Sequence, residues 1–245
     1  MSAHKLFLSE IRKPAEEIEI ELCALLFASA LATETDVDGT IRSLDEQVNG
    51  FLAKHPEYQE NAPFNSDYLI GVVGDILGYR GDSLEYFSPD NSLLNRVVET
   101  KLGIPISLAA IYVAVGRRLG ITVHGVSFPG HFLIRIVEPD GTGTLVDPFS
   151  HKKIGKDEQN ALVGAATQSF GYFDQSWIAN AHPHDFLVRM LENLKNLYLH
   201  AKDVGSVMLC LDFQLLLKPD DERFLTQLQA LRDNTAGDRG QGRLN

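Results

Sequence analysis

Residues 90–148 read DNSLLNRVVETKLGIPISLAAIYVAVGRRLGITVHGVSFPGHFLIRIVEPDGTGTLVDP. Ile104-Pro105 interrupts a helical pattern, and behind it apolar residues recur with a largely helical period until Gly120. Because proline suits the first position of a helix, the sequence predicts a helix that begins at Pro105. Ser107 then falls in the first turn, among unpaired backbone N–H groups and at the positive end of the helix dipole. This is a position at which a nucleophile can be activated.

Short strands are predicted after this helix, separated first by a Pro-Gly pair and then by a turn rich in Gly and Asp. They cover residues 122–128, 131–137 and 144–147. If the last two are antiparallel neighbours, their hairpin brings His131, at the start of one strand, beside Asp147, at the end of the next. Ser107, His131 and Asp147 would then form one site, in the chain order nucleophile, histidine, acid.

Several spaced motifs in this stretch match a known family. They are NSLLN (91–95), GIPISL (103–108), RRLG (117–120), GV (125–126), PGHFL (129–133) and VDP (146–148). On these motifs the stretch resembles the SirB-type branch of the transglutaminase-like superfamily. In that superfamily a cysteine at a helix start, a histidine on one strand and an aspartate on the next form a papain-like constellation. The resemblance therefore implies those places for Ser107, His131 and Asp147, with serine where the catalytic cysteine would be.

That serine leaves two functions open. A cysteine at such a site becomes a thiolate near neutral pH, whereas serine needs a base, an orienting carboxylate and an oxyanion hole during attack. Asn95 and Asn91 are the candidates for substrate or oxyanion contacts. One hypothesis is a hydrolase or acyl transferase acting on amide, ester or thioester bonds. The other is a non-catalytic regulatory protein that binds a peptide or protein partner through the cleft or a helical tail.

Each of the three site residues also has a structural interpretation. Ser107 would satisfy backbone donors of its own helix, His131 would be a hydrogen-bonding residue at a strand start, and Asp147 would make a turn before Pro148. His124 is a poorer histidine candidate because it lacks the Pro-Gly lead.

No cofactor is expected from the sequence. His182 and His184 are two residues apart, but no carboxylate or thiol cluster accompanies them, so a metal site is not predicted. No glycine-rich phosphate loop leads from a strand into a helix.

Composition sets limits on partners and compartment. The net charge of the 245 residues is −11, and residues 1–100 account for it, with 7 basic and 18 acidic side chains. This balance argues against nucleic acid as the main ligand, because such binding needs a basic face. Cys23 and Cys210 lie in apolar helical runs, which predicts buried, reduced thiols. No signal peptide is visible and the apolar run 22–32 is shorter than the ~20 residues that span a bilayer, so we expect a cytoplasmic protein without membrane insertion.

The predicted fold is α+β. It comprises an N-terminal helical bundle (1–88), a papain-like, transglutaminase-like core with a small antiparallel sheet (89–180), a tetratricopeptide-like helical tail (181–233) and a disordered end (234–245). Helices outside the core are predicted at about 14–29, 39–54, 65–77, 185–201, 203–217 and 222–232. The first thirteen residues are interpreted as a polar lead, and Asp185 as the cap of its helix.

Overall fold

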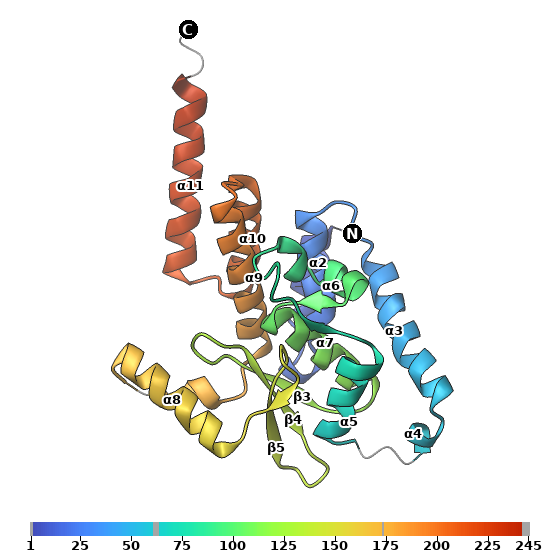
Figure 1. Cartoon of the computed structure of the whole chain (residues 1–245). Helices are drawn as coiled ribbons and strands as arrows, with labels where there is room; N and C mark the ends of the chain where they lie inside the picture. Colours follow the sequence, from blue (N-terminus) through green and yellow to red (C-terminus); the bar gives the residue numbers. More distant parts are fainter. Residues whose placement is uncertain (1, 61–63, 173, 242–245) are drawn as a thin grey trace.

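The computed structural model of the chain describes residues 2–60, 64–172 and 174–241. A small antiparallel sheet lies beside the helix α7 (Pro105–Arg118), and other helices surround both (Figure 1). This arrangement confirms the predicted α+β class. Helix α7 begins at the proline that the sequence indicated.

The helices before α7 pack around α2 (Ile20–Leu31). Most of α2 is buried, because it is apolar on nearly all sides rather than along one stripe. The other elements of this region are α1 (Ala3–Glu10), η1 (Ala15–Glu17), α3 (Val37–Lys54), α4 (Glu57–Glu60), α5 (Ser66–Ile70), η2 (Gly71–Ile76), β1 (Arg80–Gly81), η3 (Pro89–Asn91), α6 (Leu94–Thr100) and β2 (Leu102–Gly103). Helices α1, α3, α6 and α7 all contact α2.

Three elements of this region differ from the sequence-based expectation. The helix predicted over 14–29 is divided into the 3₁₀ turn η1 and the helix α2, because Ile18 and Glu19 between them have extended backbone conformations. The polar lead contains a helix, α1, because Phe7 is fully buried and its ring packs edge-on against Phe213, 4.9 Å away. The helix predicted over 65–77 is divided into α5 and the π-helical η2. At Gly74 a Cβ atom would lie 3.3 Å from the ring of His151, so glycine permits this close approach.

The four-stranded sheet has the order β3-β4-β5-β6, and each neighbouring pair is antiparallel. Its strands are β3 (Val123–Val126), β4 (Leu133–Val137), β5 (Gly143–Asp147) and β6 (Lys152–Lys153). The hairpin between β4 and β5 is the predicted one, with Ile134 opposite Val146. β6 was not predicted, because a two-residue strand carries no periodic signal.

The two faces of the sheet bury different partners. Ile134, Ile136 and Val146 belong to the main core together with the buried side of α7. Leu133 and Leu145, on the alternate positions, pack in a second cluster with residues of α8 (Lys156–Phe170) and with Trp177. The sheet is therefore covered on both faces.

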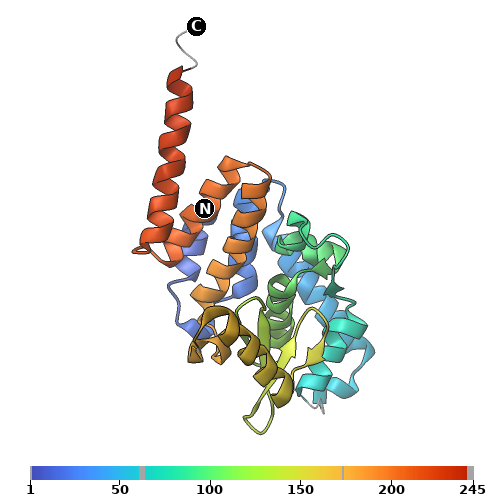
Figure 2. The ribbon, with the colours of Figure 1, turned by 60° about the vertical axis from the view of Figure 1, so that its left-hand side comes forward.

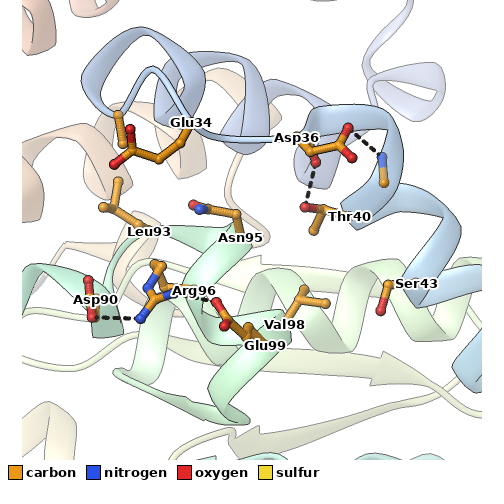
Figure 3. A pocket seen from close by; sticks show the side chains of 12 residues that line it. Glu34, Asp36, Thr40, Ser43, Asp90, Leu93, Asn95, Arg96, Val98 and Glu99 are labelled. Atoms are coloured by element: carbon orange, nitrogen blue, oxygen red, sulfur yellow. Dashed lines mark hydrogen bonds and ion pairs between the residues drawn. The ribbon is translucent and has the colours of Figure 1, made fainter.

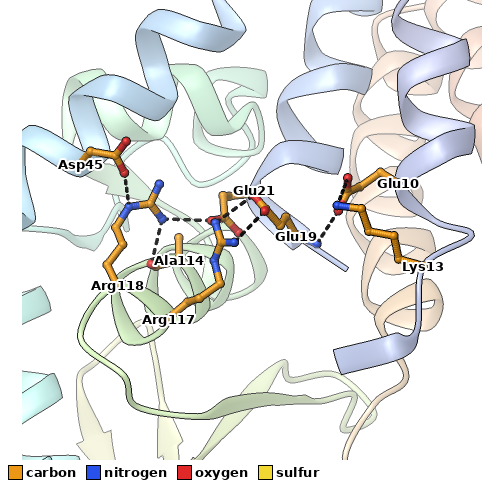
Figure 4. Close-up of polar contacts among 8 residues, drawn as sticks. All are labelled: Glu10, Lys13, Glu19, Glu21, Asp45, Ala114, Arg117 and Arg118. Carbon is orange, nitrogen blue, oxygen red and sulfur yellow. Dashed lines mark hydrogen bonds and ion pairs between the residues drawn. The ribbon is translucent and has the colours of Figure 1, made fainter. Parts of the chain in front are cut away.

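A buried carboxylate joins the end of α7 to the N-terminal helices (Figure 4). Glu21 of α2 is fully buried, and its Oε1 accepts from Arg118, at 3.0 Å, and from Arg117. Arg118 also bonds Asp45 of α3 at 2.7 Å, and Arg117 pairs with Glu19 at 2.8 Å. The adjacent arginines that resemble the family motif thus tie α7 to α2 and α3.

The C-terminal helices form an antiparallel pair followed by a longer helix (Figure 2). The elements here are η4 (Gln175–Ile178), α9 (Pro183–His200), α10 (Val204–Leu217) and α11 (Glu222–Gln241). Helix α9 is capped by His182, whose Nδ1 accepts from the backbone N–H of His184, and not by Asp185 as predicted. Asp185 instead pairs with Lys218 at 2.9 Å. Helix α11 enters the segment predicted to be disordered, and residues 242–245 of that segment lie outside the described residues.

The predicted division into domains remains a prediction. Helix α2 contacts α7 of the core as well as α9 and α10 of the tail. Cys23 and Cys210, on α2 and α10, are buried free thiols as expected.

Candidate functional site

Ser107 lies in the first turn of α7, where the sequence placed it, and its hydroxyl is directed back at the backbone. The N-cap residue is Ile104, which has no side-chain acceptor for the free N–H groups of the turn. Ser107 Oγ accepts from the Ile104 N–H at 3.0 Å and donates to the carbonyl oxygen of Asn91 at 2.6 Å. The carbonyl oxygen of Ile104 lies 3.1 Å away as a second acceptor. This is the structural interpretation that the sequence left open.

The surroundings close Ser107 off from solvent. Its exposed fraction is 0 %. A Cβ atom at Gly103 would lie 2.7 Å from Ser107 Oγ, so the backbone of β2 reaches the hydroxyl only because residue 103 has no side chain. The hydroxyl is thus a buried link between the start of α7 and η3.

His131 lies outside this buried region. It is exposed and lies two residues before the start of β4, in the loop that turns at Gly130 with φ +77°. Its backbone N–H donates to the carbonyl oxygen of Phe128, and the two rings have centroids 6.5 Å apart. The loop is the one that the Pro-Gly pair predicted.

Asp147 ends β5 and makes the turn that follows it. Its Oδ1 accepts from the backbone N–H of Phe149 at 2.9 Å, and its Oδ2 accepts from Ser150 Oγ at 2.6 Å. Burial is the main cause of the raised pKa of Tyr112 on α7, and the charge of Asp147 raises it further, so this carboxylate lies within electrostatic range of α7.

No hydrogen bond or ion pair among the described residues joins the side chains of Ser107, His131 and Asp147 to one another. The hairpin between β4 and β5 does bring His131 and Asp147 to the same end of the sheet, because Leu133, two residues after His131, continues the register opposite Asp147. As a catalytic site the three residues remain a prediction.

The two asparagine candidates have different surroundings. The Nδ2 of Asn91 donates to Asp82 and to the carbonyl oxygen of Glu85, and its own carbonyl accepts from Ser107. Asn95 lines a separate cavity of about 620 Å³ between α6 and the start of α3, where its side chain lies near Glu34 (Figure 3). Its Oδ1 is buried without a hydrogen-bond partner.

A hydrogen-bonded pair of the buried Tyr112 and the half-buried His151 was missed by the sequence reasoning. Tyr112 Oη lies 2.7 Å from His151 Nδ1, and His151 Nε2 lies 2.8 Å from the carbonyl oxygen of Tyr79. Since a carbonyl oxygen only accepts, Nε2 carries a proton, and in the neutral ring Nδ1 accepts from the tyrosine. Burial raises the pKa of Tyr112, which keeps the hydroxyl protonated. No motif marks His151; the available signal was a tyrosine on the apolar face of α7.

No group of three or more His, Cys, Asp or Glu side chains among the described residues is arranged to hold a metal ion. None of the helices in the described part of the chain is both long enough and apolar enough to cross a membrane.

Comparison with known proteins gives the family. A model described as "Transglutaminase-like superfamily" matches residues 33–192. A UPF0162 protein of Xylella fastidiosa (strain Temecula1) is 40% identical over 164 residues, which are 64% of this chain and 55% of that protein. A UPF0162 protein of Vibrio cholerae is 24% identical over 207 residues, covering 84% and 76% of the two chains. F-box only protein 21 of Mus musculus is 29% identical over 212 residues, covering 78% of this chain and 34% of that protein.

The matched region spans about half the length of the Xylella relatives. No solved structure matches the chain. The family match covers the whole of α7 and of the sheet, and it includes every motif on which the resemblance rested. The chain belongs to the transglutaminase-like superfamily.

Proposed function

We propose that this chain is a non-catalytic transglutaminase-like protein that binds a peptide or protein partner. In this proposal Ser107 stabilises the start of α7 and is not a nucleophile. The observation that carries it is the environment of Ser107 Oγ, which is fully buried and bonded to the backbone of Ile104 and Asn91.

The chemistry of serine attack explains why this environment matters. A nucleophilic serine must present Oγ to an acyl carbon and pass its proton to a histidine. Here the proton is directed at carbonyl oxygens, and among the described residues no hydrogen bond joins the exposed His131 to the Ser107 side chain. Freeing the hydroxyl would break buried hydrogen bonds of about 1 kcal/mol each and leave the Ile104 N–H and Asn91 carbonyl less well satisfied.

The candidates for the oxyanion hole support the same proposal. An oxyanion hole needs donors aimed at a point beside the nucleophile. The amide of Asn91 is already used by Asp82 and Glu85, and Asn95 lines a different cavity.

An exposed apolar segment supports partner binding. Leu84 is 94% exposed and Phe87 is 79% exposed, in the loop between β1 and η3. Single apolar side chains are common on surfaces, but two large ones this exposed within four residues are a feature of interaction sites. The loop leads directly to Asn91, whose carbonyl holds Ser107.

Acyl transfer through Ser107 is the second candidate. It is favoured by the position of His131 and Asp147 at one end of two neighbouring strands. It would require the hydroxyl of Ser107 to leave its backbone partners and become accessible.

Reaction with a fluorophosphonate probe, followed by mass spectrometry of the peptide that contains Ser107, separates the two. We expect no labelling above that of a Ser107→Ala control, because the hydroxyl is buried and bonded. Labelling of Ser107 that disappears in His131→Ala would reject the proposal and establish the acyl-transfer alternative.

A further inference from the structure

The C-terminal helices enclose a small pocket that none of the predicted site residues line. Its volume is about 260 Å³, and its walls come from α9, from α11 and from Ser127 in the loop between β3 and β4. This loop also carries His131. The pocket therefore lies between the helical tail and the core.

One residue that lines the pocket is a buried lysine whose charge is already matched. Lys195 is 2% exposed, and its Nζ lies 2.8 Å from the carboxylate of Glu192. The same Nζ donates to the side-chain oxygen of Gln227 at 2.9 Å and lies 5.4 Å from the ring centre of Phe224. Gln214 of α10 donates to Glu192 at 2.9 Å, and this hydrogen bond fixes the position of the carboxylate.

The charges at the rim are matched as well. Asp185 pairs with Lys218 at 2.9 Å, and Arg223 pairs with Asp221 at 2.7 Å. Arg189 is different. It lines the pocket and is half-buried, yet its guanidinium makes no hydrogen bond or ion pair with any described residue.

This leaves the pocket with one uncompensated positive charge. A charged side chain that lines a pocket and has no partner in the chain is available to pair with an anion that enters the pocket. The planar fork of arginine fits the two oxygens of a carboxylate. The Ser127 hydroxyl, which has no partner among the described residues, is a further donor on another wall of the same pocket.

We propose that this pocket binds a carboxylate of the peptide partner through Arg189 and Ser127, an inference that rests on the proposed function. A carboxylate, with one negative charge, suits the site better than a phosphate group, because the carboxylates of Asp185 and Glu192 line the same pocket and would repel a dianion. The pocket is smaller than the ~300–1,000 Å³ typical of sites for whole small molecules, so it fits one acidic side chain or a chain end.

The test uses the isotope-labelled full chain and NMR titration with short acetylated peptides. One arm compares Ac-Ala-Ala-Ala with a free C-terminus and its amide, and the other compares Ac-Ala-Glu-Ala-amide with its Gln analogue. We expect saturable shifts of the Ser127 and Arg189 amides only with a carboxylate-bearing peptide, and the two arms distinguish a chain end from a side chain. Equal shifts with the amide and Gln controls, or tighter binding of a phosphoserine analogue, would overturn the proposal.

Variants locate the interaction. Arg189→Gln should weaken binding at least about tenfold, which corresponds to about 1.4 kcal/mol, and Arg189→Lys should weaken it less, because it keeps the charge but loses the fork. Arg223→Gln is the matched control in the same pocket; since Asp221 already pairs with Arg223, affinity should change less than about threefold. Unchanged affinity in Arg189→Gln would overturn the assignment. The result of these titrations does not affect the labelling experiment at Ser107. The carboxylate pocket can therefore be rejected while the proposed non-catalytic role of Ser107 still stands.

Discussion

Replacing Ser107 by cysteine tests the proposed role of this residue, because a structural site and a nucleophilic site would shift the pKa of the new thiol in opposite directions. If the site retained a nucleophilic environment, the helix dipole and His131 would favour a thiolate. In the structure the side chain at this position is fully buried and faces the carbonyl oxygens of Asn91 and Ile104. Both the burial and these negative ends of dipoles disfavour an anion. We therefore expect the pKa of the thiol in Ser107→Cys to lie above the ordinary value of about 8.5.

The buried cysteines of the chain give the magnitude. Burial raises the pKa of Cys210 to about 12. An equal shift in Ser107→Cys would disfavour the thiolate by about 4 kcal/mol, since each pKa unit corresponds to about 1.4 kcal/mol. A helix N-terminus contributes ~2 kcal/mol at most, so burial dominates. At pH 8 the thiolate fraction would fall by about a thousandfold relative to an unperturbed thiol.

The assay is the rate of iodoacetamide labelling against pH, read for each cysteine-containing peptide by mass spectrometry. Residue 107 in Ser107→Cys should react as slowly as Cys23 and Cys210 in the folded protein. A pKa below about 8.5, or labelling at residue 107 that is fast and depends on His131, would mean that the site favours a thiolate and that Ser107 lies in a nucleophilic environment.

Three further predictions concern the stability of the protein and the reactivity of its buried thiols. Arg118→Ala should lower the free energy of unfolding in urea by about 3 kcal/mol, because the buried carboxylate of Glu21 loses a partner; a loss below about 1 kcal/mol would contradict this. Burial lowers the pKa of Lys101 to about 8, against 10.5 for the free side chain. At pH values between these two pKa values, the unfolded chain binds more protons than the folded chain. The stability of the wild-type protein should therefore rise with pH relative to that of Lys101→Met from about pH 8 to 10. If the urea midpoints of the wild type and of Lys101→Met changed in parallel with pH, this prediction would be wrong. Cys23 and Cys210 should be modified only at the rate of unfolding, because burial raises the pKa of both thiols; rapid modification of either in the folded protein would be the contrary result.

The sequence predicted those features that local signals determine. Pro105 marks the start of α7, and the Pro-Gly pair and the Asp-Gly turn mark the ends of the strands, because each restricts the backbone where it stands. Helix α1 was missed because its burial depends on Phe213 in a distant helix.

In the candidate site, too, the contacts between residues that are distant in sequence could not be predicted. The position of Ser107 in the first turn follows from local pattern, but the direction of its hydroxyl depends on Asn91, sixteen residues earlier in the chain. The partners of His151, Tyr112 and Tyr79, lie 39 and 72 residues away in sequence. Such contacts are set by the packing of α7 against its neighbours and have no periodic signature.

An NMR measurement of the proton contacts of Ser107 in the folded wild-type protein tests whether its hydroxyl is bonded to the backbone or faces His131. The structure predicts nuclear Overhauser effects from the Ser107 side chain to Gly103 and Ile104, together with a slowly exchanging hydroxyl proton bonded to the Asn91 carbonyl. It predicts none to the His131 ring. Effects between the Ser107 side chain and the imidazole of His131, with a hydroxyl proton in rapid exchange with water, would contradict the account.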